Sequence, residues 1–278
     1  LIVDQQGIFA PVDDPQYSDP VTNPFQPTTP TRIADTRSCL GLAGCIGLPV
    51  AAMSWTNVDV GAFVDPESVL SDVPATARAA VVAVTIDSPA AAGYASVLPG
   101  DVNTVTTSNL NFDAGRSVTA TAIVRLNDGA NGVARVFTSA AAHIQVDILG
   151  WFDSGGQPLD PSGGFVPIAP RRLLDSRVPT GTPHLAAGTL TTIDAAPAGV
   201  PATATAVLAN QVAVNTLDAG ELQVAATAQP QPPVFRNLSA GAAGVTVAAS
   251  TITRTDNAQY TIRNTGRTHV ISDLWGYF

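Results

Sequence analysis

The sequence predicts an all-β protein built from two tandem antiparallel β-sandwich domains, of jelly-roll or immunoglobulin-like type, with an extended N-terminal arm. Two observations predict it. The chain of 278 residues carries one long pattern twice, with the copies 140 residues apart at their start. Its composition, with 45% apolar and 13% charged residues, 23 Gly and 22 Pro, favours short strands joined by turns.

The repeated pattern has a front (Phe-x-Pro-x-x-Pro-x-Arg-x-x-Asp-x-Arg), a middle (Val-Pro-Ala-Thr-Ala) and an ending (His-x-x-x-Asp-x-x-Gly-aromatic-Phe). These parts occupy residues 25–37, 73–77 and 143–152 in the first copy, and 165–177, 200–204 and 269–278 in the second. A repeat of this size is a domain. The predicted organisation is an arm and tether at 1–24, a first sandwich at 25–153, a linker at 154–164 and a second sandwich at 165–278.

Strands are predicted where apolar and β-branched residues alternate or cluster between turn signals, with no helical periodicity. In the first copy they are residues 79–86, 94–98, 118–126, 132–138 and 142–149. In the second copy they are residues 204–214, 221–225, 245–253, 259–264 and 269–275.

The loop after the front differs between the copies. Arg37 and Val73 are 36 positions apart, whereas Arg177 and Val200 are 23 positions apart. The first copy thus has 13 extra residues, which are taken to include both cysteines and Trp55. This insertion is the predicted place for a role special to the first domain.

Cys39 and Cys45 lie within this glycine-rich insertion, with five residues between them. A disulfide is predicted, because the low charge and the absence of other thiols fit an oxidising compartment. Two free thiols are the alternative. A metal site would need two further ligands, for which the neighbouring sequence offers no candidate.

The charged pairs Asp35/Arg37 and Asp175/Arg177 occur in both copies, and they are predicted to form a structural latch between the first and last strands. A glycan- or phosphate-binding role for these arginines is the alternative. His143 and His269 also recur, and without neighbouring ligands they are interpreted as hydrogen-bonded structural residues.

Charge and motifs exclude several function classes. The net charge of −9 lacks the basic surface that nucleic-acid binding requires, and no apolar run is long enough to span a membrane. The chain has none of the common hydrolase, zinc-protease, nucleotide or calcium motifs. We therefore predict no enzymatic activity, no catalytic residues, no metal and no cofactor.

Together the front, middle and ending resemble a module repeated in secreted proteins of actinobacteria and related bacteria. The first copy departs from that module by having Trp151 where the pattern has Tyr, and by its inserted loop. The resemblance implies an accessory surface module. It fits a chain that begins with Leu1 instead of Met, which predicts an exported protein whose signal peptide has been removed.

The N-terminal segment combines β-prone residues with a proline-rich tether. Its apolar residues are predicted to form an assembly arm that either folds back on its own chain or adds as a strand to a neighbour; they are Leu1, Ile2, Val3, Ile8 and Phe9. The predicted function is an extracellular structural protein, a subunit of a non-covalent surface filament, pilus-like fibre or sheath. Its predicted partners are copies of itself, joined by strand donation.

The alternative function is a carbohydrate-binding or adhesive module at the cell surface, with a surface glycan as ligand. Such a module needs exposed aromatic side chains on a shallow face. The candidates are Trp55, Tyr94, Trp151 and Trp275. A third interpretation is an accessory domain of a larger secreted hydrolase.

Overall fold

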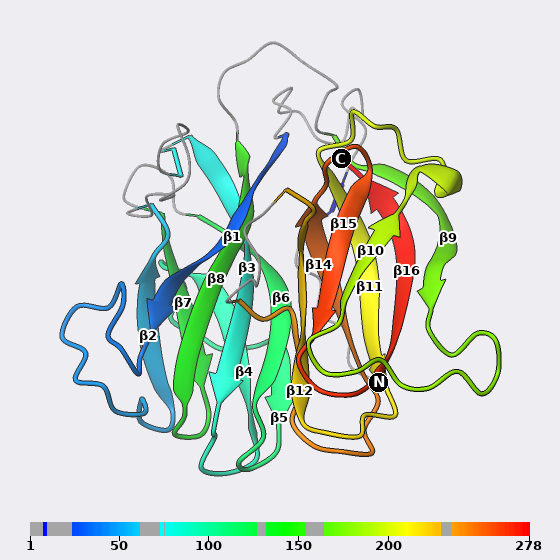
Figure 1. The fold of residues 1–278 in the computed structure, drawn as a ribbon. Coiled ribbons are helices and arrows are strands. Elements are labelled where there is room, and N and C mark those ends of the chain that lie inside the picture. Colours follow the sequence, from blue (N-terminus) through cyan, green and yellow to red (C-terminus); the bar gives the residue numbers. More distant parts are fainter. Residues whose placement is uncertain are drawn as a thin grey trace.

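The computed structural model describes residues 8–9, 24–61, 73–74, 76–126, 132–153, 164–228 and 235–278. In these ranges every pair of neighbouring strands is antiparallel, and the only helical segment is a 3₁₀ turn at Ala196–Ala198. The predicted fold class, an all-β protein of antiparallel sandwiches, is confirmed. Figure 1 shows the two sandwiches side by side.

The first sandwich consists of two four-stranded sheets, with strand orders β1-β8-β3-β6 and β2-β7-β4-β5 among the described residues. Its strands are β1 (Phe25–Asp35), β2 (Ser54–Asp59), β3 (Ala77–Asp87), β4 (Gly93–Pro99), β5 (Leu110–Phe112), β6 (Val118–Arg125), β7 (Val133–Thr138) and β8 (His143–Asp153).

The second sandwich repeats this topology, with orders β9-β16-β11-β14 and β10-β15-β12-β13. Its strands are β9 (Val166–Asp175), β10 (Leu190–Asp194), β11 (Ala206–Val214), β12 (Gly220–Ala226), β13 (Leu238–Ala240), β14 (Val247–Arg254), β15 (Gln259–Asn264) and β16 (His269–Tyr277). In both sandwiches the front motif pairs with the last strand, β1 with β8 and β9 with β16. The prediction that both halves adopt the same sandwich topology, with the front motif paired to the last strand, is confirmed.

Each predicted strand matches an observed one, but six observed strands were not predicted. Two of them, β1 and β9, carry prolines and lie at sheet edges, where a missing backbone donor costs least. Two more, β5 and β13, have three residues each, too few for a periodic pattern. The last two, β2 and β10, lie in the predicted loop after the front of each copy.

The prediction that Trp55 belongs to the insertion is wrong. This residue pairs with Phe137 in β2, and its counterpart Leu190 pairs with Arg263 in β10, so Trp55 belongs to a strand that both sandwiches share. Arg37 and Trp55 are 18 positions apart, against 13 for Arg177 and Leu190. The loop with the cysteines thus holds five of the extra residues, and the other eight follow β2.

Alternation along the strands creates a core in each sandwich. In β8, Ile144, Val146 and Ile148 point into the first core, whereas the residues between them face away from it. Burial of each such side chain contributes about 1.5–3 kcal/mol. In the second core, Tyr260 is fully buried and its hydroxyl lies 2.7 Å from the hydroxyl of Ser272.

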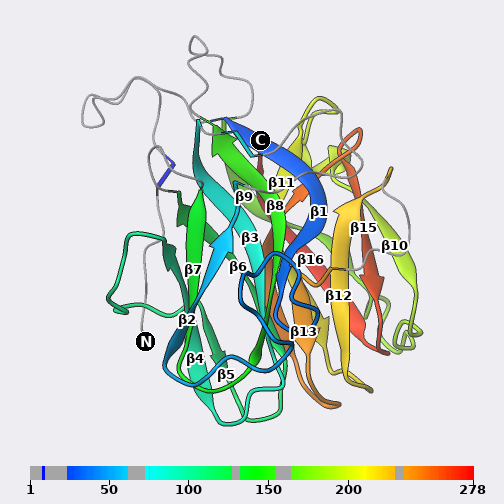
Figure 2. The same cartoon turned by 90° about the vertical axis from the view of Figure 1, so that its left-hand side faces the viewer.

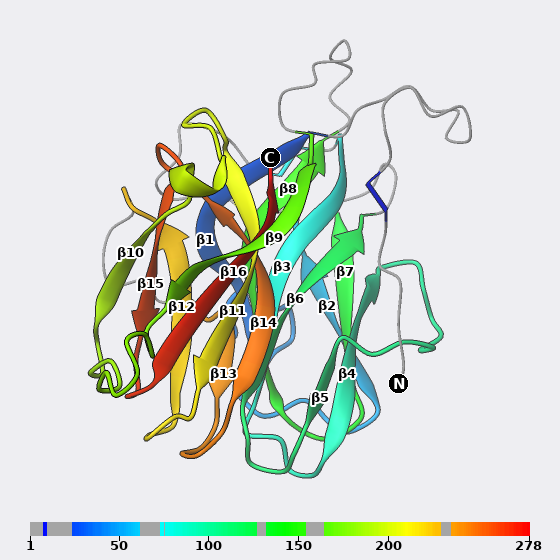
Figure 3. The same ribbon diagram turned by 90° about the vertical axis from the view of Figure 1, so that its right-hand side faces the viewer.

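The two sandwiches meet at a junction in which the edge of the second covers the outer face of the first. Strands β13 and β14 lie against β6, and β12 and β14 lie against β1, as Figures 1 and 3 show for β14 and β6. In Figure 2 the β1-β8-β3-β6 sheet lies between the β2-β7-β4-β5 sheet and the second sandwich. The junction has its own apolar cluster, made by Phe25, Val81, Ala83, Leu149, Phe152, Ala206, Ile252 and Phe278.

Several predictions concern residues outside the described ranges. The residues concerned are Leu1, Ile2 and Val3 of the arm, nearly all of the tether, and residues 154–163 of the linker. The boundaries assigned to the arm, the tether and the linker therefore stay predictions.

Candidate functional site at the junction of the sandwiches

The predicted latch residues form a compact pair in each sandwich. The Arg37 guanidinium donates to both oxygens of Asp35, at 3.2 and 3.0 Å, and its backbone N–H donates to the same carboxylate at 2.9 Å. Arg177 binds Asp175 in the same way. Hydrogen bonds from Arg177 hold the pKa of Asp175 well below its ordinary value. Arg37 also binds Asp87 at the end of β3, at 2.9 Å. In the first sandwich the pair contacts the last strand through Asp35, which accepts from the Gln145 side-chain amide on β8 at 2.8 Å.

In both sandwiches an arginine outside the predicted latch also binds the last strand, and in the first sandwich it is Arg32. Its Nε and Nη2 donate to the two oxygens of Asp147 on β8, at 2.9 and 3.3 Å. Arg172 binds Asp273 on β16 at 2.8 and 3.1 Å. Both arginines and both aspartates are fixed positions of the repeated pattern. This recurrence is the sequence signal that could have identified them as partners. Bidentate contacts between an arginine and a carboxylate are strong and directional.

Burial distinguishes the two copies of this contact. The side chain of Arg32 is 19% exposed and that of Asp147 is 0% exposed, against 49% and 23% for Arg172 and Asp273. Burial raises the pKa of Asp147 above its ordinary value, although Arg32 acts in the opposite direction. The first copy is thus an ion pair inside the junction, and the second is a surface pair.

The second sandwich supplies the groups that cover the buried copy. The backbone N–H of Arg236, just before β13, donates to Asp147, and the Arg236 side chain pairs with Glu221 of β12. Beside them, the hydroxyls of Thr85, Thr119 and Ser239 form a chain with separations of 2.8 and 2.9 Å. The junction therefore combines an apolar cluster with a hydrogen-bonded polar one.

The recurring histidines are tied to the front motif. His143 Nδ1 lies 3.0 Å from the Thr36 hydroxyl, and His269 Nδ1 lies 3.2 Å from the Ser176 hydroxyl. His184 stacks on His269 with ring centroids 4.1 Å apart. Burial, together with His184, lowers the pKa of His269. Among the described residues no three His, Cys, Asp or Glu side chains are grouped to hold a metal ion.

The predicted disulfide between Cys39 and Cys45 is confirmed. The loop turns sharply at Gly41, where φ is +65° and a Cβ atom would collide with the carbonyl oxygen of Ile33. Around the disulfide, large apolar side chains are exposed; they are Leu40, Ile46, Leu48 and Met53.

The four aromatic candidates for glycan binding do not form one surface. Trp55 and Tyr94 flank Phe137 on the outer face of the β2-β7-β4-β5 sheet, with ring centroids 5.2 and 5.8 Å from that of Phe137. Trp151 packs against the first core. Trp275 is 38% exposed on β16 in the other sandwich.

Of the predicted assembly arm, the structure describes Ile8 and Phe9. The Phe9 ring contacts Phe152, Phe165 and Phe278, with centroids 5.8, 4.8 and 5.7 Å away. Both arm residues remain about half exposed, and neither is part of a strand. At Phe9, therefore, the arm lies on the junction of its own chain.

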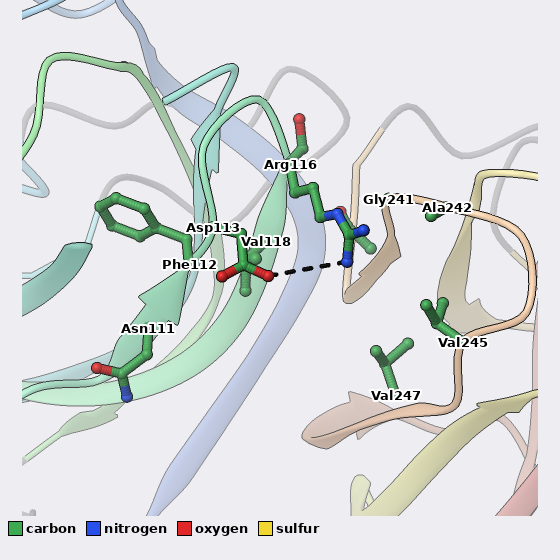
Figure 4. Close-up of a pocket in the computed structure, with 11 residues that line it drawn as sticks. Asn111, Phe112, Asp113, Arg116, Val118, Gly241, Ala242, Val245 and Val247 are labelled. Atoms are coloured by element: carbon green, nitrogen blue, oxygen red, sulfur yellow. Dashed lines mark ion pairs between the residues drawn. The ribbon is translucent and has the colours of Figure 1, made fainter. Parts of the chain in front are cut away.

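A pocket opens where the two sandwich edges approach each other. Figure 4 shows Phe112, Asp113 and Arg116 on one side, and Gly241 and Val245 on the other. Arg116 pairs with Asp113 at 3.7 Å, on its own side of the pocket. With both charges on the surface and paired to each other, the pocket presents no group poised for chemistry.

No family model and no curated protein matches the chain. One solved structure similar to it is a chain from "Life in the extremes: atomic structure of Sulfolobus Turreted Icosahedral Virus". That chain is 9% identical, the alignment covers 83% of this chain and 88% of the viral chain, and the TM-score is 0.21. The described residues contain no helix long and apolar enough to cross a membrane.

Proposed function

We propose that this chain is an extracellular structural protein whose partners are copies of itself, assembled into a surface filament or sheath. The proposal extends to export and to membership of the secreted module that the repeated pattern resembles. In its finer form, the arm at residues 1–12 pairs as a strand with the next subunit.

The observation that carries the proposal is the junction. One copy of the module binds another copy, and this contact buries an ion pair, a hydroxyl chain and an apolar cluster. The apolar cluster is the part of this contact that resembles permanent interfaces, which bury core-like apolar surface. A module that already binds its own kind within one chain needs little change to do so between chains.

Sedimentation velocity and negative-stain microscopy of the natural chain test the proposal. We expect concentration-dependent growth into filaments or sheets. A chain that stays monomeric at high concentration would contradict self-assembly.

Deleting residues 1–12 tests strand donation separately. We expect two folded sandwiches that no longer polymerise, and a free arm peptide that blocks growth of the natural chain. If the truncated chain forms the same assembly, donation is wrong while self-assembly stands. Because Phe9 contacts its own chain, an arm donated to a neighbouring subunit would have to extend away from its own subunit at Phe9.

A second candidate function, glycan binding, is favoured by the row of Trp55, Phe137 and Tyr94 on the first sandwich. Arg135 lies 6.0 Å from the Trp55 ring centroid and donates to Asn57 Oδ1 at 2.9 Å. Aromatic faces with a few oriented polar groups are typical of sugar-binding surfaces.

A glycan array probed with the natural chain tests this second function. Binding that is lost in Trp55→Ala but kept in Trp275→Ala would support it. An array without signal, or equal signal from both variants, would contradict it.

A further inference from the structure

The outer faces of the two equivalent sheets have different surroundings. Strand register relates them position by position: Val81 of β3 pairs with Gly150 as Leu208 of β11 pairs with Gly276. By the same register Ala83, Thr85 and Leu149 correspond to Asn210, Val212 and Trp275. The three residues of the first sandwich are buried, whereas Asn210 and Val212 are partly exposed and Trp275 is 38% exposed.

Part of the outer face of the β14-β11-β16-β9 sheet is already taken by the junction, where Leu208 packs against the apolar cluster. We call the remainder, around Val212 and Trp275, the open face. It carries Val212 and Trp275 as apolar residues, with the Arg172–Asp273 ion pair beside them. Ala248, the counterpart of the buried Thr119, is also exposed. The open face thus combines an apolar area, including a large aromatic, with a charged pair, as the covered face of the first sandwich does.

The covered face shows what kind of element fits such a surface. It is occupied by a sandwich edge, in which Arg236 donates its backbone N–H to Asp147 and Ser239 bonds Thr119. The first sandwich has the counterpart of this edge in β4 and β5. There Asn111 pairs with Tyr94 as Ser239 pairs with Glu221. Asn111 is exposed and lines the pocket between the two sandwiches of its own chain.

We propose that the open face binds a second copy of this chain, which presents the β4–β5 edge of its first sandwich around Asn111. The inference rests on the proposed self-assembly and names the surfaces that carry it. Because the face and the edge are different surfaces, each subunit keeps one of them free after binding. Repetition of such a head-to-tail contact closes a ring or extends a filament.

The two surfaces can be blocked one at a time. Trp275→Arg places a charge on the open face, and Asn111→Arg enlarges and charges the edge. Both residues are exposed within a subunit, so both variants should fold. Leu190→Arg is the matched control, since Leu190 is 45% exposed on β10 in the opposite sheet of the second sandwich.

Sedimentation velocity of the full-length variants gives the test. We expect Trp275→Arg and Asn111→Arg each to remain monomeric at ten times the concentration at which the natural chain and Leu190→Arg assemble. An equimolar mixture of the two variants should stop at a one-to-one dimer, because one intact face meets one intact edge.

The outcomes separate this inference from the proposed function. If the natural chain assembles and Trp275→Arg assembles equally well, the open face is not the contact, although self-assembly stands. If each blocked variant alone is monomeric but the mixture forms no dimer, the pairing of this face with this edge is wrong. If the natural chain itself never assembles, both proposals fail.

Discussion

At the scale of single residues, the same Arg–Asp contact serves in two environments, which makes the chain its own control. Removing Arg32 leaves the Asp147 carboxylate buried in the junction without its cation. Breaking a buried pair in this way costs about 3–5 kcal/mol, whereas a surface pair contributes about 0–1 kcal/mol. We expect Arg32→Ala to lower the free energy of unfolding far more than Arg172→Ala, as measured by urea denaturation. Equal losses would contradict the difference in environment.

A second residue-scale prediction concerns acid stability. Hydrogen bonds from Arg267 lower the pKa of Asp218 to about 2. Because the folded-state pKa lies below the unfolded one, this carboxylate stabilises the fold above about pH 4, and the contribution is lost as the pH falls toward 2. We expect Asp218→Asn to lose less stability than the natural chain between pH 5 and pH 2, as measured by urea midpoints. Parallel pH profiles would refute this assignment.

At the scale of elements, the sequence predicts the strands that run through the centre of each sandwich better than those at the edges. The alternation of Ile144, Val146 and Ile148 identifies β8, because that strand has one face in the core. The edge strands β5 and β13 carry no such pattern, and their pairing depends on a side chain. The amide oxygens of Asn109 and Asn237 accept from the backbone N–H of Val97 and Val224, at 2.7 and 2.6 Å.

This asparagine bond supports an element-scale prediction. Asn237 is 1% exposed, so replacing it with Ala would leave the Val224 N–H buried without its partner. An unpaired buried backbone donor costs about 1–3 kcal/mol. We expect Asn237→Ala and Asn109→Ala to be destabilised in this range, with the larger loss at Asn237. Proton exchange of the Val224 amide gives the direct readout, and unchanged protection there would contradict the role.

The candidate site shows the same limit of sequence reasoning. The repeated Arg32 and Asp147 were visible as fixed positions, but their contact depends on bulges that shift the register of β1 against β8. Arg236 covers this contact, but its counterpart in the first sandwich is the uncharged Ser108. Nothing in the spacing of one repeat predicts which surface of the other repeat it meets.

At the scale of the whole molecule, the junction should make two sandwiches unfold as one unit. Leu149, 2% exposed, belongs to the apolar cluster that joins them, and its counterpart Trp275 faces outward in the second sandwich. We expect the natural chain to give a single calorimetric transition, with equal calorimetric and van't Hoff enthalpies.

A charge placed in the junction should separate the two transitions. In Leu149→Arg, an unpaired charge replaces a buried apolar contact, which costs several kcal/mol and removes the coupling between the sandwiches. Each sandwich keeps its own core, so we expect two thermal transitions with the lower one well below that of the natural chain. Trp275→Arg should keep one transition at nearly the natural temperature. If the natural chain already melts in two separated steps, or if Leu149→Arg melts as one unit, the junction does not couple the sandwiches.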